Sequence, residues 1–143
     1  MPAARPAVFL DRDGTLIADA VYLRTVEQLR ILSGAVEAVR QVNEAGFAAV
    51  IVTNQAGIAR GLLTEDDLAR VHAELLTRFQ AQGARIDSVY YCPHHPTEGN
   101  AHYRILCPCR KPAPGMLQLA ARELGLDLAR SAMIGDNPTD MGA

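Results

Sequence analysis

Short apolar runs alternate with helical patterns along this chain. Four runs have the length of strands buried in a sheet, and each meets polar residues at its carboxyl end: residues 7–10, 47–52, 86–91 and 132–134. Between them, apolar side chains recur at helical spacing in three segments, which stop at Gly46, Gly83 and Gly125. Strands that alternate with helices predict the α/β fold class, with a doubly wound, mainly parallel sheet and right-handed crossovers.

The second helical segment carries the clearest start signal. Thr64 stands at the expected N-cap and Asp67 follows three residues later, which is the spacing of a capping box. Apolar residues then recur on one face until Gly83. The third segment follows Pro114, a residue suited to the first turn of a helix. His72 lies inside the second segment, where we expect a structural side chain.

Polar residues that could bind a ligand or take part in catalysis follow three of the four predicted strands. Asp11 and Asp13 come after the first strand, Thr53 and Asn54 after the second, and Asp136 after the fourth. In open parallel sheets, ligands bind outside the carboxyl ends of the strands. We therefore expect these side chains to meet in one crevice at that edge.

Two carboxylates this close in the sequence can repel each other, so their negative charge must be balanced. At about 4 Å they repel by ~1 kcal/mol in water and ~4 kcal/mol at an effective dielectric of 20, which favours a bound cation or a shared proton. Magnesium, a hard cation with oxygen ligands, suits the pair Asp11 and Asp13, and Asp136 and Asp140 offer further carboxylates. The arrangement favours attack on phosphorus, with one carboxylate as nucleophile and the second as general acid and base.

Charge that develops on a transferring phosphoryl group also needs hydrogen-bond donors. Thr53, Asn54, Arg110 and Lys111 are the candidates. Taken singly, Asp-x-Asp-Gly, Thr-Asn and Arg-Lys-Pro are each typical of an ordinary turn, helix cap or solvated loop. Their shared position, at strand ends or in the connection to the next strand, favours a functional site.

Composition narrows the class of partner. The 143 residues include 14 Lys+Arg and 16 Asp+Glu, with a formal net charge of −2, so no general attraction to nucleic acid or to an anionic membrane is expected. No apolar run approaches the roughly 20 residues of a membrane-spanning helix, and residues 1–6 lack the apolar core of a secretion signal. We expect one domain over residues 1–143, a cytoplasmic monomer that acts on a small molecule.

The motifs, taken in order, resemble those of the haloacid dehalogenase-like phosphatases. They are Asp11-x-Asp13-Gly14-Thr15, Thr53-Asn54-Gln55, Arg110-Lys111-Pro112 and Gly135-Asp136-x-x-x-Asp140. Longer stretches, residues 53–61, 91–96 and 107–112, are similar to the D-glycero-D-manno-heptose 1,7-bisphosphate 7-phosphatases, which are relatives of the histidinol phosphatases. The likeness covers nearly the whole chain, from Val8 to Met141.

The resemblance implies a role for each matched residue. Asp11 would be the nucleophile and Asp13 the general acid and base, and magnesium would be held by Asp11, Asp136 and the backbone carbonyl of Asp13. Two residues match phosphate-binding positions and three match substrate contacts: Thr53 and Lys111, and Asn54, Arg110 and Asn137. Residues 19–22 match a substrate-contacting loop, although Ala20-Val21 departs from the His-Gly of the family.

The three cysteines lie close to one another in the sequence. Cys92-x-His94 and Cys107-x-Cys109 supply three thiolates and an imidazole, a set suited to tetrahedral zinc, although the spacing alone fits reduced loop cysteines equally well. The family carries a zinc loop with this pattern, which favours a closed, structural zinc site over residues 92–109. His95 and His102 remain alternatives to His94.

Two features of the layout affect specificity and completeness. About seventeen residues separate Thr15 from the first helix, too few for a cap domain, so we expect an open site. The chain stops at Ala143, whereas the family continues with another helix and strand, so the carboxyl-terminal edge of the sheet is expected to be missing. Histidinol phosphate is the alternative substrate, and a catalytically silent zinc-loop binding module is the alternative of another class.

Overall fold

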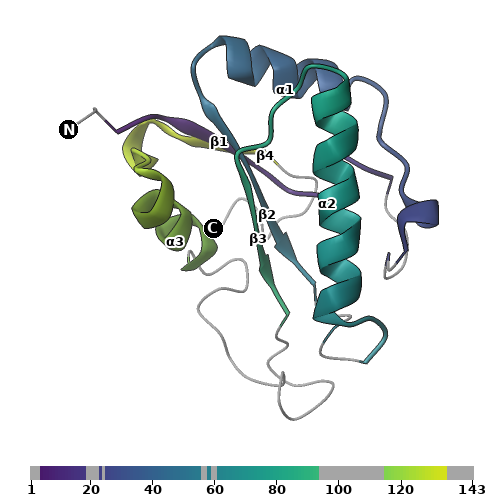
Figure 1. Ribbon diagram of the computed structural model, residues 1–143. Helices are drawn as coiled ribbons and strands as arrows, with labels where there is room; N and C mark the ends of the chain where they lie inside the picture. Colours follow the sequence, from purple (N-terminus) through teal and green to yellow (C-terminus); the bar gives the residue numbers. More distant parts are fainter. Residues whose placement is uncertain are drawn as a thin grey trace.

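The structure is a computed structural model that describes residues 4–18, 23, 25–55, 58, 61–93 and 115–134. In chain order its elements are β1 (Ala7–Leu10), η1 (Val26–Gln28), α1 (Ala35–Glu44), β2 (Ala48–Asn54), α2 (Glu65–Ala81), β3 (Ser88–Cys92), α3 (Gly115–Leu124), η2 (Leu128–Arg130) and β4 (Ala132–Ile134). The four strands form one sheet in the order β3-β2-β1-β4, and all three pairings are parallel. The predicted parallel α/β architecture is confirmed (Figure 1).

Strand β1 lies between two partners. Val8 is in register with Ala49 of β2 and with Ala132 of β4. The chain leaves β1 at Asp11, whose backbone N–H donates to the carbonyl of Ile134 at 2.9 Å. The connections to β2 and to β4 run over opposite faces of the sheet, so the end of β1 is the switch point at which α/β sheets bind ligands.

Two hydrophobic clusters pack on opposite faces of this sheet. Val8 and Leu10 of β1 belong to the cluster that includes residues of α1 and α2, whereas Phe9, between them, belongs to the cluster that includes Met116 and Ala120 of α3. Figure 1 shows the same division, with α1 and α2 on one side of the sheet and α3 on the other. Strands β1 and β2 are therefore buried on both faces, as their continuous apolar runs predict.

Helix α2 starts as its sequence predicts. The hydroxyl of Thr64 accepts from the backbone N–H of Asp67 at 3.0 Å, and the carboxylate of Asp67 accepts from the N–H of Thr64 at 2.9 Å. The backbone hydrogen bond from Thr64 is the main cause that lowers the pKa of Asp67. No helix in the described part of the chain is both long enough and apolar enough to span a bilayer.

The limits of strands β2 and β3 differ from the predicted 47–52 and 86–91. Strand β2 extends through Thr53 and Asn54, because these residues pair with Tyr91 and Cys92 of β3. They are therefore the last residues of the strand and not the start of a loop. Strand β3 begins at Ser88 instead of residue 86, since the sheet pairing with β2 begins there.

The sheet is least buried at β4. This strand is only three residues long, and Ile134 is 49% exposed at the edge of the described sheet. Between β1 and α1 the described residues contain a single short helix, η1. The absence of a cap domain and of a further edge strand beyond β4 both stay predictions.

Removal of a large core side chain tests the packing of α2. Phe79 is fully buried in the cluster with α1 and the sheet, so Phe79→Ala is expected to lower the free energy of unfolding by about 3–5 kcal/mol. Gln80→Ala, at the exposed neighbouring position, should change it by less than about 0.5 kcal/mol. Urea unfolding followed by circular dichroism measures both, and equal effects would contradict this packing.

Candidate active site

The turn after β1 brings two acidic side chains to the carboxyl edge of the sheet. Asp11 is buried, with 9% of its surface exposed. The carbonyl of Arg12 accepts from the N–H groups of Leu16 and Ile17 at 3.0 and 3.1 Å, which closes a tight turn. Gly14 has a φ of 79° in this turn, a conformation that costs glycine little. The spacing Asp-x-Asp-Gly thus follows from the shape of the turn.

The carboxylate of Asp13 is held by donors on both of its oxygens. Arg12 donates from Nε to Oδ1 at 3.2 Å, and from Nη2 to Oδ1 and Oδ2 at 3.0 and 3.1 Å. Gln55 donates from Nε2 to Oδ2 at 3.2 Å. These hydrogen bonds fix the position of Asp13, whose side chain is 24% exposed.

Gln55 joins the ends of β1 and β2. Its side-chain amide also donates to the hydroxyl of Thr53 at 2.9 Å, and its backbone N–H donates to the carbonyl of Cys92 at 2.8 Å. Thr53 is buried and Asn54 is half-buried at the strand end. Of the residues expected to bind phosphate or substrate, Thr53 is linked through Gln55 to Asp13, and Asn54 is its neighbour in the strand.

A buried cation lies behind the acidic pair. Arg12 is 1% exposed, and its Nη1 lies 3.2 Å from Nε2 of His72, which α2 carries. Burial first, and the charge of Arg12 second, lower the pKa of His72 from 6.5 to about 3. His72 is therefore neutral near pH 7. Arginine only donates hydrogen bonds, so Nε2 of His72 accepts and its proton is on Nδ1.

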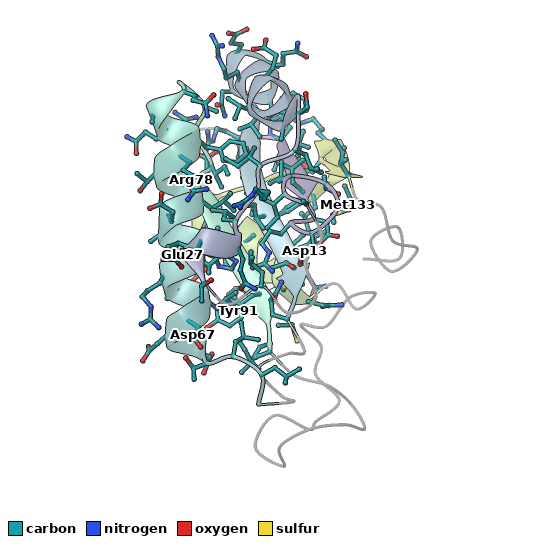
Figure 2. The ribbon with its side chains drawn as sticks, turned by 90° about the vertical axis from the view of Figure 1, so that its right-hand side faces the viewer. Asp13, Glu27, Asp67, Arg78, Tyr91 and Met133 are labelled. Atoms are coloured by element: carbon teal, nitrogen blue, oxygen red, sulfur yellow. The ribbon has the colours of Figure 1, made fainter. Side chains whose placement is uncertain are left out.

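The ring of His72 also faces β3. Its centre lies 6.3 Å from that of Tyr91, with the ring planes 56° apart. The Tyr91 hydroxyl donates to Glu65 in the first turn of α2 at 2.8 Å. Figure 2 shows Asp13 and Tyr91 to the same side of α2. The buried imidazole of His72 thus lies close to Tyr91 of β3 as well as to Arg12.

Gln55 and Arg12 are not among the site residues expected from the sequence, and His72 is expected to be structural and not catalytic. Gln55 belongs to the Thr53-Asn54-Gln55 motif, and Arg12 stands between the two aspartates. The sequence motifs therefore already contain both residues. A histidine on the apolar face of α2, between Leu68 and Leu75, also indicates a buried polar group that needs a partner.

Many of the expected site residues lie outside the described residues. They are residues 19–22, His94, His95, His102, Cys107, Cys109, Arg110, Lys111, Asp136, Asn137 and Asp140. Among residues that are described, no group of three or more His, Cys, Asp or Glu side chains is arranged to hold a metal ion. The complete magnesium and zinc sites therefore stay predictions.

Cys92 is the one expected zinc ligand within the described part of the chain. It lies at the end of β3 with no exposed surface, and it is disulfide-bonded. The sulfur of a disulfide is not a thiolate, so zinc binding would require the reduced form. The two states of Cys92 exclude each other.

Comparison with known proteins assigns the class. A protein-family model described as "haloacid dehalogenase-like hydrolase" matches residues 18–143 of this chain. With the parallel sheet and the acidic pair at the end of its central strand, the chain belongs to the haloacid dehalogenase-like hydrolases, and the resemblance noted from the motifs is confirmed.

The more similar relatives share a single name, D-glycero-beta-D-manno-heptose-1,7-bisphosphate 7-phosphatase. The protein from Rhodopseudomonas palustris is 46% identical over 97% of this chain and 77% of its own length. The protein from Yersinia pestis is 43% identical over 100% of this chain and 76% of its own length. The Escherichia coli K12 protein is 41% identical over 100% of this chain and 75% of its own length.

Among the solved structures that are similar over almost the whole chain are two phosphatases. A HAD-like phosphatase from Mesorhizobium loti is 38% identical with a TM-score of 0.93, over 99% of this chain and 68% of that one. The D,D-heptose 1,7-bisphosphate phosphatase of B. bronchiseptica, complexed with magnesium and phosphate, is 32% identical with a TM-score of 0.82, over 96% of this chain and 73% of that one.

The neutral state of His72 predicts how stability depends on pH. Because the pKa is about 3 in the folded protein and about 6.5 in the unfolded chain, the unfolded chain binds more protons between these values. His72 therefore stabilises the fold fully above pH 6.5. Its contribution falls as the pH is lowered towards 3, by up to about 1.4 kcal/mol per pH unit.

Denaturant unfolding between pH 7 and pH 4 measures this slope, and His72→Gln is the matched variant. The wild type should lose more stability than the variant over this range. In an NMR titration, the His72 ring signals should not shift between pH 8 and pH 5. A ring that titrates near pH 6.5 would contradict the buried, neutral assignment.

Proposed function

We propose that this protein is a phosphatase that removes the 7-phosphate of D-glycero-D-manno-heptose 1,7-bisphosphate through an aspartyl phosphate, in the synthesis of nucleotide-activated heptose. One observation supports the chemistry. Asp11 and Asp13 lie in the turn after β1, at the topological switch point of the sheet. The substrate rests on the relatives named above, which are 41–46% identical over nearly the whole chain.

The reaction would proceed in two steps. In the first, an oxygen of Asp11 attacks phosphorus, the bond from phosphorus to the sugar oxygen breaks, and Asp13 gives a proton to the departing oxygen. In the second, Asp13 takes a proton from water as the water oxygen attacks phosphorus. The bond to Asp11 then breaks and inorganic phosphate leaves. Each step leaves Asp13 in the form that the next one needs.

Five residues are proposed to bind the substrate, and two of them, Thr53 and Asn54, lie in the described part of the chain. Thr53, Asn54, Arg110, Lys111 and Asn137 would bind the phosphate and the sugar. Thr53 lies at the end of β2 and is linked to Asp13 through Gln55, which supports its proposed role. The four hydrogen bonds to Asp13 suit its ionised form, which is the form that accepts the proton of water.

Magnesium is the proposed cofactor. Asp11 carries a buried carboxylate, whose hard oxygens suit this ion, and Asp136 and the Asp13 backbone carbonyl would complete its protein ligands. When bound, magnesium would reduce the repulsion between the nucleophile and the phosphate. The similar B. bronchiseptica phosphatase was solved with magnesium and phosphate.

The remaining parts of the proposal concern the surroundings of the site. Reduced Cys92, with His94, Cys107 and Cys109, would bind a structural zinc ion that orders the loop before Arg110 and Lys111. The whole chain, residues 1–143, would act as one cytoplasmic, monomeric domain without a cap. Its partner would be a small sugar phosphate and not nucleic acid, in keeping with the net charge of −2.

Replacement of the nucleophile tests the chemistry. Asp11→Asn keeps the size of the side chain but cannot form the aspartyl phosphate, so phosphate release from the heptose bisphosphate should fall by on the order of 10³-fold or more. Thermal melts of the variant should stay close to the wild type. An active Asp11→Asn enzyme would contradict the mechanism.

The same phosphate-release assay separates the alternatives. Histidinol phosphate is tested beside the heptose bisphosphate under magnesium, and we expect the larger kcat/KM for the heptose. Preference for histidinol phosphate would reassign the substrate. No turnover of either compound would favour the zinc-loop binding module, and EDTA should abolish any turnover that depends on magnesium.

Metal analysis of reduced protein tests the zinc proposal. We expect about one zinc per chain in the wild type, lost in Cys92→Ser and after oxidation of the thiols, because a thiolate ligand is removed in both cases. Parallel analysis of His94→Asn and His95→Asn identifies the histidine ligand. Zinc retained in oxidised protein would show that Cys92 is not a ligand.

A further inference from the structure

A row of hydrogen bonds links Asp13, Arg12 and His72 inside the site, and the two-step mechanism does not explain it. Arg12 is almost completely buried, although it lies between the two reacting aspartates. One side of its guanidinium is bound to Asp13, and Nη1, on the other side, meets His72. Buried charges are costly unless their N–H groups are satisfied. Both contacts of Arg12 are therefore needed to keep it in place.

The partner on the far side of Arg12 is neutral, and this determines what the contact does. A carboxylate at position 72 would satisfy the N–H groups equally well, but it would compete with Asp13 for the positive charge. Neutral His72 accepts one hydrogen bond and leaves Asp13 as the acid that the guanidinium of Arg12 binds. The imidazole thus orients the guanidinium without weakening its hold on Asp13.

We propose that His72 is a positioning residue for the phosphatase reaction, which fixes the carboxylate of Asp13 through the guanidinium of Arg12. The inference rests on the proposed function, since it assigns a purpose to the position of Asp13. His72 does not touch the reacting atoms. It lies 60 positions from Arg12 in the chain, on α2, so one of the helices that cover this face of the sheet takes part in the geometry of the site.

The dependence on the leaving group distinguishes this role from a merely structural one. A sugar oxygen needs a proton from Asp13 as it departs, whereas p-nitrophenolate is a stable anion that departs without one. The comparison uses kcat/KM, which includes steps up to the first irreversible one and so excludes hydrolysis of the aspartyl phosphate. A misplaced Asp13 should therefore lower kcat/KM much more for the heptose bisphosphate than for p-nitrophenyl phosphate.

The experiment compares both substrates in a set of variants. His72→Leu, which cannot accept a hydrogen bond, should lower kcat/KM for the heptose bisphosphate by at least about tenfold, and for p-nitrophenyl phosphate by less than about threefold. His72→Gln, which keeps an acceptor, should recover most of the loss. Leu75→Ala, a buried change one turn along α2, is the control and should leave the ratio of the two substrates unchanged.

A double-mutant cycle tests the route through Arg12. Arg12→Lys keeps the charge but not the forked set of donors, so it should reproduce the pattern of His72→Leu. The two changes combined should be little worse than either alone, because both break the same chain of contacts. If His72→Leu does not fold, His72→Asn, which stops short of Arg12, takes its place.

The outcomes separate this inference from the proposed function. Asp13→Asn is measured in parallel as the reference. If Asp13→Asn discriminates strongly between the substrates and His72→Leu affects both equally, or if the effects of Arg12→Lys and His72→Leu simply add, the positioning role is overturned and the phosphatase mechanism stands. If Asp13→Asn itself does not discriminate, the acid role of Asp13 fails and the inference fails with it.

Discussion

Parallel pairing of β1 with a strand on each side determines where polar groups can meet in this protein. Since the chain passes from β1 to β2 over one face and reaches β4 over the other, the carboxyl end of β1 is the topological switch point of the sheet. Asp11 enters this space directly from the strand, with its backbone held by Ile134. The chemistry of the protein depends on that position more than on any single contact.

Burial then turns a row of ordinary polar residues into a fixed site. Arg12 cannot reach bulk water, so its charge is satisfied by Asp13 and by the neutral His72. Gln55 adds a second donor to Asp13 and ties it to Thr53 of the neighbouring strand. In the low effective dielectric of this interior, each hydrogen bond has a larger influence on its partners than the same contact would have at the surface.

Much of this could be predicted from the sequence, because the signals were local. The four apolar runs and the Thr64 capping box each depend on residues within a few positions, and the structure confirms them. The positions of Asp11, Asp13 and Thr53 followed from the same runs, since motif residues come at strand ends. The family resemblance supplied their roles and the substrate, which no pattern of apolar residues encodes.

The part that could not be predicted depends on distant residues. The contact between Arg12 and His72 needs the exact rotation of α2 over the sheet, and helical periodicity gives only the face of the helix. The extension of β2 through Asn54 depends on pairing with β3, some 38 positions further along the chain. Such features are set by tertiary packing, which the local signals of one sequence do not contain.

The shortness of β4 has a consequence for how the protein would lose order. Its three residues are the least covered part of the described sheet, yet Ile134 accepts the backbone hydrogen bond of Asp11, the proposed nucleophile. Amide protons in such a strand open to solvent through small local fluctuations, at a lower free energy than global unfolding. Partial fraying at this edge would therefore release Asp11 while both hydrophobic clusters are still intact.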